Sequence, residues 1–396
     1  MFGDKTSYMA NIAYLFPPME SIIIYKYLTR IGVDLMIGKD QAFHHLFICY
    51  TPSELPRSFE QLSLTFPDLS RLDHVPGLGH RLILVVSFSE LGKVLDFASD
   101  LSCRFIFDQL NEQLRRAYSP NFRIRNLVWT KKRPKIMGII NITPDSFYDG
   151  GKHYQKQNYA KIAEKMIASG ADIIDIGGES TRPGSKSIDA SEELRRVLPV
   201  VTQIRRRFEI PISVDTIKPA VADEVLKAGA DLINDVSGLS AGREMLDIVK
   251  CHHASYCLMH TQGTPEIMQK DPSYKDVLAE VYDFFQKKLA FCETHGLKRD
   301  RVLLDPGIGF GKKTDHNLDL LRFISVFSNL ECLILQGSSN KSFIGRLLKR
   351  EVNQRLSGTL ATQSLGWVNG ASVFRVHQVA ENKDVTEIAA IYTSCN

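Results

Sequence analysis

The fold is decided by a stretch that starts at residue 136 with IMGIINI (136–142) and resumes with YAKIAEKMIASGADIIDI (159–176). The first segment is a short apolar run rich in isoleucine, which is typical of a buried strand. Residues 159–169 have helical periodicity, and Gly170-Ala171-Asp172 separates them from a second apolar run. Glycine suits the C-terminal end of a helix. The order strand, helix, strand predicts a unit whose two strands are parallel.

The same unit repeats along the rest of the chain. Apolar runs that we interpret as strands cover residues 136–142, 173–176, 212–214, 232–233, 256–259, 302–304, 333–335 and 373–376. Helical stretches lie near residues 159–169, 191–208, 219–228, 242–250, 274–295, 318–327, 353–367 and 385–393. Asp189 is placed to cap the second of these helices. Eight units in roughly 260 residues predict an α/β fold, a closed (β/α)₈ TIM barrel, because doubly wound sheets more often stop at five or six strands.

Composition excludes several classes of protein. Of the 396 residues 44% are hydrophobic and 24% are charged, which is too hydrophobic for a disordered chain. The net charge of +4 is too small to indicate nucleic-acid binding, and we find neither a membrane-spanning stretch nor a secretion signal. The seven cysteines form no Cys-x-x-Cys pair. We therefore expect reduced thiols, no zinc site, no membrane or nucleic-acid partner, and a cytoplasmic protein.

The first 130 residues differ from the rest. Their apolar runs (46–50, 81–88 and 103–107) are irregularly spaced, with helical periodicity at 89–98 and 108–118. We predict a smaller N-terminal α+β domain of unknown role, residues 1–130, followed by the barrel domain, residues 131–396. Residues 119–134 contain two prolines and several basic residues, so we expect an exposed connection there.

Polar side chains follow the predicted strands, at the end of the barrel where the active sites of this fold lie. Asp215, Asn234 and Asp305 follow the third, fourth and sixth strands. Their carboxylate and amide groups have the chemistry to pair with the edge of a flat heterocycle. Taken singly, each Asp is more often a turn or helix-cap residue. The prediction therefore depends on the three residues converging at one place.

A second set of strand-end residues is cationic or carries hydroxyl groups. Its members are Thr181, Arg182, Lys341, Ser342, Arg375 and His377. With the amides of glycine-rich loops, they predict a site for an anion or phosphate. The run Gly307-Ile308-Gly309-Phe310-Gly311-Lys312 is not a phosphate loop, because Pro306 precedes it and Lys313 separates Lys312 from Thr314.

Seven motifs occur in a characteristic order. MGIINITPDSF (137–147) and DIGGESTRPG (175–184) are highly specific. They are followed by SVDT (213–216), INDVSG (233–238), LMH (258–260), DPGIGFG (305–311) and RVH (375–377). From about residue 135 to its end, the chain resembles the dihydropteroate synthases, folate-pathway enzymes that sulfonamides inhibit.

The resemblance implies a pterin-binding transferase that joins 6-hydroxymethyl-7,8-dihydropterin diphosphate to 4-aminobenzoate and releases diphosphate. It implies that the pterin is bound by Asp215, Asn234, Asp305, Lys341 and Arg375, the diphosphate by Asn141, Thr181, Arg182 and His377, and the aminobenzoate by Phe147, Pro183, Phe310 and Ser342. Lys341, Arg375 and His377 are the implied catalytic residues. Mg²⁺ is the implied cofactor, with Asn141 as its ligand, and a homodimer is the implied assembly.

Three positions depart from this family's usual residues. Asn340 stands where the family has Arg, Gln378 where it has Asp, and Thr261 where it has Met. Loss of the arginine removes a cation from the aminobenzoate side, so a weakly active or sulfonamide-tolerant form is one alternative. A methyltetrahydrofolate-binding methyltransferase domain and a pterin-binding protein without turnover are two others. Residues 1–130 contain no Asp-x-Asp pair, which argues against a fused pyrophosphokinase.

Overall fold

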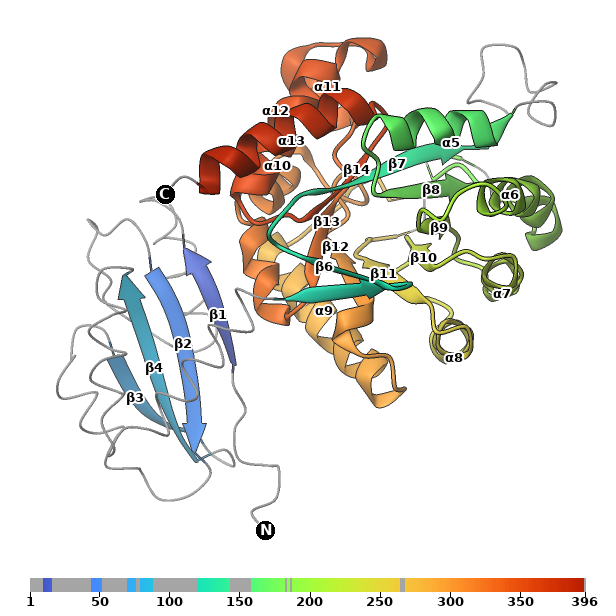
Figure 1. The fold of residues 1–396 in the computed structure, drawn as a ribbon. Coiled ribbons are helices and arrows are strands. Elements are labelled where there is room, and N and C mark those ends of the chain that lie inside the picture. Colours follow the sequence, from blue (N-terminus) through green and yellow to red (C-terminus); the bar gives the residue numbers. More distant parts are fainter. Residues whose placement is uncertain are drawn as a thin grey trace. The chain divides into compact units, whose positions relative to one another are not determined.

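The computed structural model describes the backbone of residues 10–15, 44–51, 70–75 and 79–87, and then residues 120–142, 158–181, 184–185, 187–263 and 268–394. Contacts divide the chain into two compact units, Met1–Ser119 and Pro120–Asn396. The strands and helices of each unit are shown in Figure 1.

The first unit contains a four-stranded antiparallel sheet. Its strands are β1 (Ala10–Leu15), β2 (His44–Thr51), β3 (Ser70–Val75) and β4 (Gly79–Ser87), in the spatial order β1-β2-β4-β3. Strands β2 and β4 coincide with two of the apolar runs in the sequence. The third run and the two helical stretches expected before residue 119 lie outside the described residues.

The second unit is a closed barrel of eight parallel strands, which confirms the predicted fold (Figure 1). The strands are β7 (Lys135–Asn141), β8 (Ile173–Gly177), β9 (Ile212–Asp215), β10 (Leu232–Asp235), β11 (Ser255–Met259), β12 (Val302–Asp305), β13 (Leu333–Gln336) and β14 (Val373–Val376). Each pairs in parallel with its neighbours, and β14 pairs with β7 to close the ring. All five residues of β8 are buried, as expected of a strand covered on both faces.

Helices surround the barrel in the predicted alternation (Figure 1). They are α5 (Tyr159–Ala168), α6 (Ala190–Arg205), α7 (Pro219–Lys227), α8 (Arg243–Cys251), α9 (Val277–Thr294), α10 (Thr314–Arg322), α11 (Ser342–Leu348), α12 (Leu356–Val368) and α13 (Val379–Ser394). The Asp189 carboxylate accepts a hydrogen bond from the Glu192 amide at 2.8 Å, which confirms the predicted cap of α6. Gly170 follows α5 with a φ of +94°, as expected for a glycine at a helix C-terminus. Among the described helices, none is long and apolar enough to cross a bilayer.

Two helical predictions differ from the structure. The stretch expected at residues 318–327 is instead α10, which begins at Thr314, followed by a 3₁₀ segment, Ile324–Leu330. Helix α11 was not predicted, because its seven residues are too few for apolar periodicity to stand out. It directly follows the loop that carries Lys341, so the residues after β13 are held at a helix N-terminus.

A β-hairpin closes the N-terminal end of the barrel, where we had expected an exposed connection. Its strands are β5 (Asn121–Ile124) and β6 (Leu127–Thr130). Phe122 and Ile124 are fully buried and Trp129 is 3% exposed. They form one cluster with the barrel-lining side chains of Met137, Ile173, Leu232, Cys257, Leu303, Leu333, Leu335 and Val373. The prediction of an exposed connection was wrong. Phe122 and Ile124 alternate with polar residues, which is typical of a half-buried strand. The neighbouring prolines and basic residues are typical of a loop, and they obscured this short signal.

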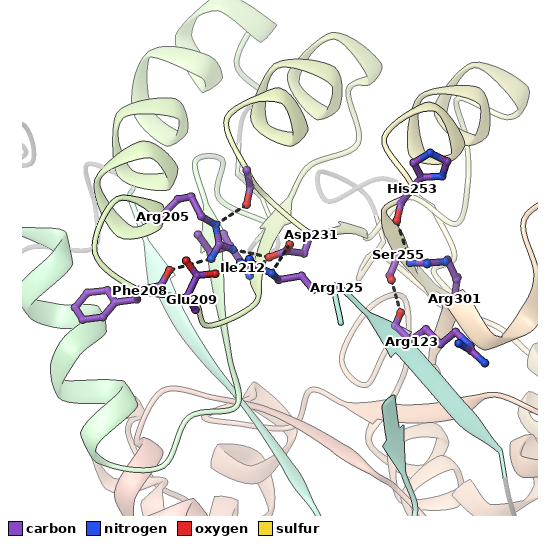
Figure 2. A network of polar contacts seen from close by, with 11 residues as sticks. Arg123, Arg125, Arg205, Phe208, Glu209, Ile212, Asp231, His253, Ser255 and Arg301 are labelled. Atoms are coloured by element: carbon purple, nitrogen blue, oxygen red, sulfur yellow. Dashed lines mark hydrogen bonds and ion pairs between the residues drawn. The ribbon is translucent and has the colours of Figure 1, made fainter. Parts of the chain in front are cut away.

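Polar contacts join this hairpin to residues at the N-terminal ends of β9, β10 and β11 (Figure 2). The Ser255 hydroxyl donates to the carbonyl of Arg123 at 2.6 Å. Arg125 lies 3.5 Å from Asp231, whose other oxygen accepts from Arg205 at 2.6 Å and from the Ile212 amide at 2.8 Å. Burial raises the pKa of Asp231, and these donors oppose the increase. The hairpin is therefore part of the barrel.

Candidate functional site

The centre of the site is an arginine between two carboxylates. Arg375 on β14 donates through Nε to Asp175 on β8 at 2.7 Å, and through Nη2 to Asp215 at the end of β9 at 3.0 Å. Asp175 is fully buried and Asp215 is 7% exposed. All three side chains lie toward the C-terminal ends of the strands, which we call the mouth of the barrel. Because two carboxylates bind the guanidinium of Arg375, they fix its plane.

Asp175 is a site residue that our sequence reasoning missed. One of its oxygens accepts from the Ser213 hydroxyl at 2.5 Å, and the other accepts from Arg375. A signal was present in the sequence, since Asp175 is a charged residue inside the buried run of β8. Charged side chains are rarely fully buried unless they are paired, so this position itself predicts a partner.

The predicted acid and amide residues converge with Arg375. Asp215 and Asn234 are paired residues of adjacent strands, and Asp305 ends the next strand but one. Asn234 is 2% exposed, and its side-chain oxygen has no hydrogen-bond partner among the described residues. Asp305 accepts from the Gly307 amide at 2.8 Å. An unpaired buried carbonyl oxygen costs free energy, so Asn234 is suited to accept a hydrogen bond from a ligand.

Lys341 completes this group. It lies at the N-terminus of α11, and its ammonium is 4.0 Å from the centroid of the Phe310 ring. Burial and the positive charge of Arg375 lower the pKa of Lys341 to about 8, against the opposing effect of Asp305 and Asp215. Burial also raises the pKa values of Asp215 and Asp305, while Arg375 acts against the increase in both. The site therefore holds two cations and three carboxylates in a largely dehydrated space.

The residues expected at the diphosphate lie around the same mouth where the structure describes them. Asn141 ends β7, and Thr181 follows β8. His377 follows β14, is exposed, and lies with Nδ1 3.0 Å from the Ser339 hydroxyl. Arg182 lies outside the described residues. Among the described residues, no group of three His, Cys, Asp or Glu side chains could hold a metal ion.

The residues expected at the aminobenzoate are described only in part. Phe310 is 9% exposed and packs against Met259 and Met268. Ser342 is exposed at the first position of α11. Phe147 and Pro183 lie outside the described residues. Phe310 and Ser342 both lie beside Lys341, Phe310 through its ring and Ser342 as the next residue in the chain.

An ion-pair cluster holds the start of the loop that follows β8. The ammonium of Lys218 contacts Glu179 in that loop and lies 2.6 Å from Glu193 on α6. Glu193 is 1% exposed. Burial lowers the pKa of Lys218, but its two carboxylate partners more than offset this, and the net shift is upward. The cluster fixes the segment that leads to Thr181.

Two of the three unusual residues contact each other. The Asn340 amide lies 3.4 Å from the side-chain oxygen of Gln378. Asn340 has a left-handed φ of +57°, and its backbone is held by Thr359, which accepts from its amide at 3.0 Å, and by Arg355, which donates to its carbonyl at 3.0 Å. This neutral pair sits one residue from Lys341 on one side and from His377 on the other.

Comparison with known proteins identifies the family of the barrel. Residues 137–377 match the family described as pterin binding enzyme. Dihydropteroate synthase of Escherichia coli (strain K12) is 46% identical over 255 residues, covering 64% of this chain and 90% of that protein. The crystal structure of Yersinia pestis dihydropteroate synthase with a sulfonamide drug complex has a TM-score of 0.65 at 40% identity, covering 69% of this chain and 99% of that one.

A further solved structure carries a small ligand. Xanthomonas albilineans dihydropteroate synthase with 4-aminobenzoic acid has a TM-score of 0.64 at 39% identity, covering 70% of this chain and 99% of that one. The matches cover the barrel and leave the N-terminal residues aside. The chain belongs to the pterin binding enzymes and, within them, to the dihydropteroate synthases.

Proposed function

We propose that the barrel joins 6-hydroxymethyl-7,8-dihydropterin diphosphate to 4-aminobenzoate, forming 7,8-dihydropteroate and diphosphate. The arylamine nitrogen attacks the pterin methylene carbon, the bond from that carbon to oxygen breaks, and diphosphate leaves with the electron pair. The amine then loses a proton. One observation carries the proposal: Arg375 is held between Asp175 and Asp215 beside Asn234, whose buried side-chain oxygen finds no partner in the described part of the chain.

The pterin ring is the reactant that we place deepest. Asp215, Asn234 and Asp305 would accept hydrogen bonds from its ring and amino N–H groups, while Lys341 donates to a ring acceptor and the Arg375 guanidinium stacks on its face. Hydrogen bonds to charged groups contribute about 1.5–3 kcal/mol, and a ligand without matching donors would leave these groups unpaired. The same residues would thus provide both affinity and selectivity.

The leaving diphosphate would face Asn141, Thr181, Arg182 and His377, whose donors and cations stabilise the charge that develops on it. Mg²⁺ bound with the diphosphate would neutralise part of that charge. The Asn141 side chain fits such a role, because Mg²⁺ prefers oxygen ligands and retains several waters, so one protein oxygen and the diphosphate suffice. Phe147, Pro183, Phe310 and Ser342 would border the aminobenzoate. Because the arylamine is already nucleophilic, the chain needs only to hold both reactants at attack distance.

We also propose a homodimer. Helices α12 and α13 expose five large apolar side chains: Leu365, Val368, Ile388, Ile391 and Tyr392. Grouped apolar exposure of this kind supports a protein contact. Light scattering after size exclusion tests it, with Ile388→Lys expected to give a monomer. The described cysteines are free thiols, which supports a cytoplasmic location.

The test of the reaction is diphosphate release by the purified full chain given both substrates. Release that requires the pterin diphosphate and 4-aminobenzoate together supports the proposal. A methyltransferase domain would release none, and a pterin-binding protein without turnover would bind the pterin without release. The domain boundary is a separate proposal: since the hairpin packs under the barrel, we start the barrel domain at Pro120, eleven residues before the start expected from the sequence.

A further inference from the structure

Lys312 is a lysine with no exposed surface. It lies at the end of the loop that joins β12 to α10. Among the described residues, no carboxylate pairs with its ammonium, although fully buried lysines usually need one. Its role is not explained by the substrate contacts proposed above.

The side-chain nitrogen of Lys312 is held by groups from two different loops. It donates to the carbonyls of Phe310 at 3.0 Å and of His260 at 3.3 Å, and it lies 3.0 Å from Nδ1 of the His260 ring. Burial and the charge of Lys312 lower the pKa of His260 to about 2, so the ring is neutral. A neutral imidazole can accept from an ammonium or donate to an amine, so the lysine is satisfied in either form. Lys312 therefore joins the loop after β11 to the loop after β12.

The two loops also pack backbone to backbone around this lysine. A Cβ atom on Gly307 would lie 1.9 Å from the His260 carbonyl oxygen, and one on Gly311 would lie 2.4 Å from that of Gln262. Both glycines have positive φ values, +70° and +61°. Any other residue would force the loops apart. The hydrogen bonds of Lys312 thus act where the two loops approach too closely for a Cβ at Gly307 or Gly311.

Phe310 connects this interface to the site. Its carbonyl accepts from Lys312, while its ring lies 4.0 Å from the ammonium of Lys341 and packs against Met259 and Met268. The hydrogen bond to the Phe310 carbonyl restricts the orientation of the peptide plane at Phe310. The backbone orientation in turn determines the direction of the Phe310 ring. A displacement at Lys312 would reach the substrate side through Phe310.

We infer that Lys312 is a positioning residue that sets the aminobenzoate subsite by fixing Phe310 against Lys341. The inference rests on the proposed function, because it assigns the Phe310 side of the site to 4-aminobenzoate. Two residues of the pterin side have contacts that do not involve the Lys312 ammonium, since Asp305 accepts from the Gly307 amide and Asp215 from Arg375. Removing the polar end of Lys312 would therefore change the binding of one substrate more than that of the other.

The experiment compares Lys312→Met with Lys313→Met in the full chain. Methionine keeps the length and apolar stem of the lysine but donates no hydrogen bond. Lys313 is the matched control, because the next lysine in the loop is 55% exposed and pairs with Asp271 on the surface. We expect Lys312→Met to raise the KM for 4-aminobenzoate about tenfold and to change the KM for the pterin diphosphate by less than about threefold. Lys313→Met should change neither.

A purely structural lysine would behave differently. It would lower the melting temperature and the active fraction, hence the apparent kcat, without separating the two KM values. A folded Lys312→Met variant with both KM values unchanged, or raised in parallel, overturns the inference. If that variant does not fold, His260→Phe decides, because it keeps the ring packing but removes the Nδ1 contact. It should raise the aminobenzoate KM selectively, and equal KM changes would overturn the inference. Absence of diphosphate release by the unmodified chain would overturn the proposed function and this inference together.

Discussion

Arg375 Nε lies 2.7 Å from a carboxylate oxygen of Asp175, although 200 positions separate the two residues in the sequence. Asp175 has no exposed surface, and Ser213 binds its second oxygen at 2.5 Å. Breaking a buried pair is costly because the remaining charge stays buried without a partner. The Asp175 carboxylate therefore fixes the guanidinium on which we propose that the pterin stacks.

The first prediction concerns Asp175→Asn. The change keeps the shape of the side chain but removes its charge, so Arg375 loses its most buried acceptor. We expect unfolding to become easier by about 3 kcal/mol and kcat/KM for the pterin diphosphate to fall about a hundredfold. Denaturant titration and steady-state kinetics measure the two effects. Asp247→Asn, which breaks an exposed pair with Arg243, is the control and should change neither. Full activity in Asp175→Asn would contradict the assigned role of the pair.

The second prediction is an alkaline limit on activity. Because the pKa of Lys341 is lowered to about 8, its charge is present below that pH and lost above it. We expect kcat/KM for the pterin diphosphate to fall as the pH rises through about 8. An Lys341→Arg variant keeps its charge at every pH in the range, so any activity that it retains should lack this decrease. If kcat/KM falls in the same way above this pH in both proteins, a group other than Lys341 causes the decrease.

The third prediction concerns Asn340. Asn340→Arg would place a cation beside Gln378 and next to Lys341, on the side where we propose that the aminobenzoate lies. We expect the KM for 4-aminobenzoate to fall about fivefold. The left-handed φ of +57° is less favourable for Arg than for Asn, so the melting temperature should drop slightly. Asn340→Gln is the uncharged control. An unchanged KM would show that this position does not face the second substrate.

The fourth prediction concerns the cluster around Lys218. Lys218→Met would leave Glu179 and the buried Glu193 without their shared cation, freeing the start of the loop that leads to Thr181 and Arg182. We expect the KM for the pterin diphosphate to rise about tenfold. Lys227→Met, on the exposed face of α7, is the control. A change in stability alone would limit the cluster to a structural role.

The fifth prediction concerns the hairpin. Phe122→Ala should cost about 3–5 kcal/mol of stability, because a fully buried ring is removed from the closed end of the barrel. A chain that begins at Pro120 should fold and remain active, whereas one that begins at residue 131 should expose the barrel interior and aggregate. Circular dichroism and light scattering distinguish the two fragments. A stable, active 131–396 fragment would contradict the boundary that we propose.

The barrel could be predicted from the sequence because each of its strands is a buried apolar run followed by a helix. Ile173–Gly177 is buried along its whole length, so its hydrophobicity is continuous and easy to see. Asp215, Asn234 and Asp305 could be predicted for a related reason, since polar residues at the ends of such runs share one edge of a parallel barrel.

Other parts could not be predicted because their signals were short or ambiguous. The seven residues of α11 span about two turns, too few for a periodic pattern. Lys312 follows a glycine-rich run that is similar to a phosphate loop but does not match its pattern, so the sequence indicates no partner for its ammonium. In the structure the ammonium contacts backbone carbonyls of two loops. The pairing of Asp175 with Arg375 depends on barrel closure, which brings β14 beside β7 and one strand away from β8.

The hairpin β5–β6 closes the barrel at its N-terminal end, opposite the mouth. With that end closed, a ligand that reaches Asp175 and Arg375 comes from the mouth of the barrel. If the pterin lies deeper than the aminobenzoate, as we propose, the pterin diphosphate would bind first and the joined product would leave only after the upper position is free. Compounds that bind above an already bound pterin would then trap it in the barrel. Their affinity would increase as the occupancy of the pterin position rises.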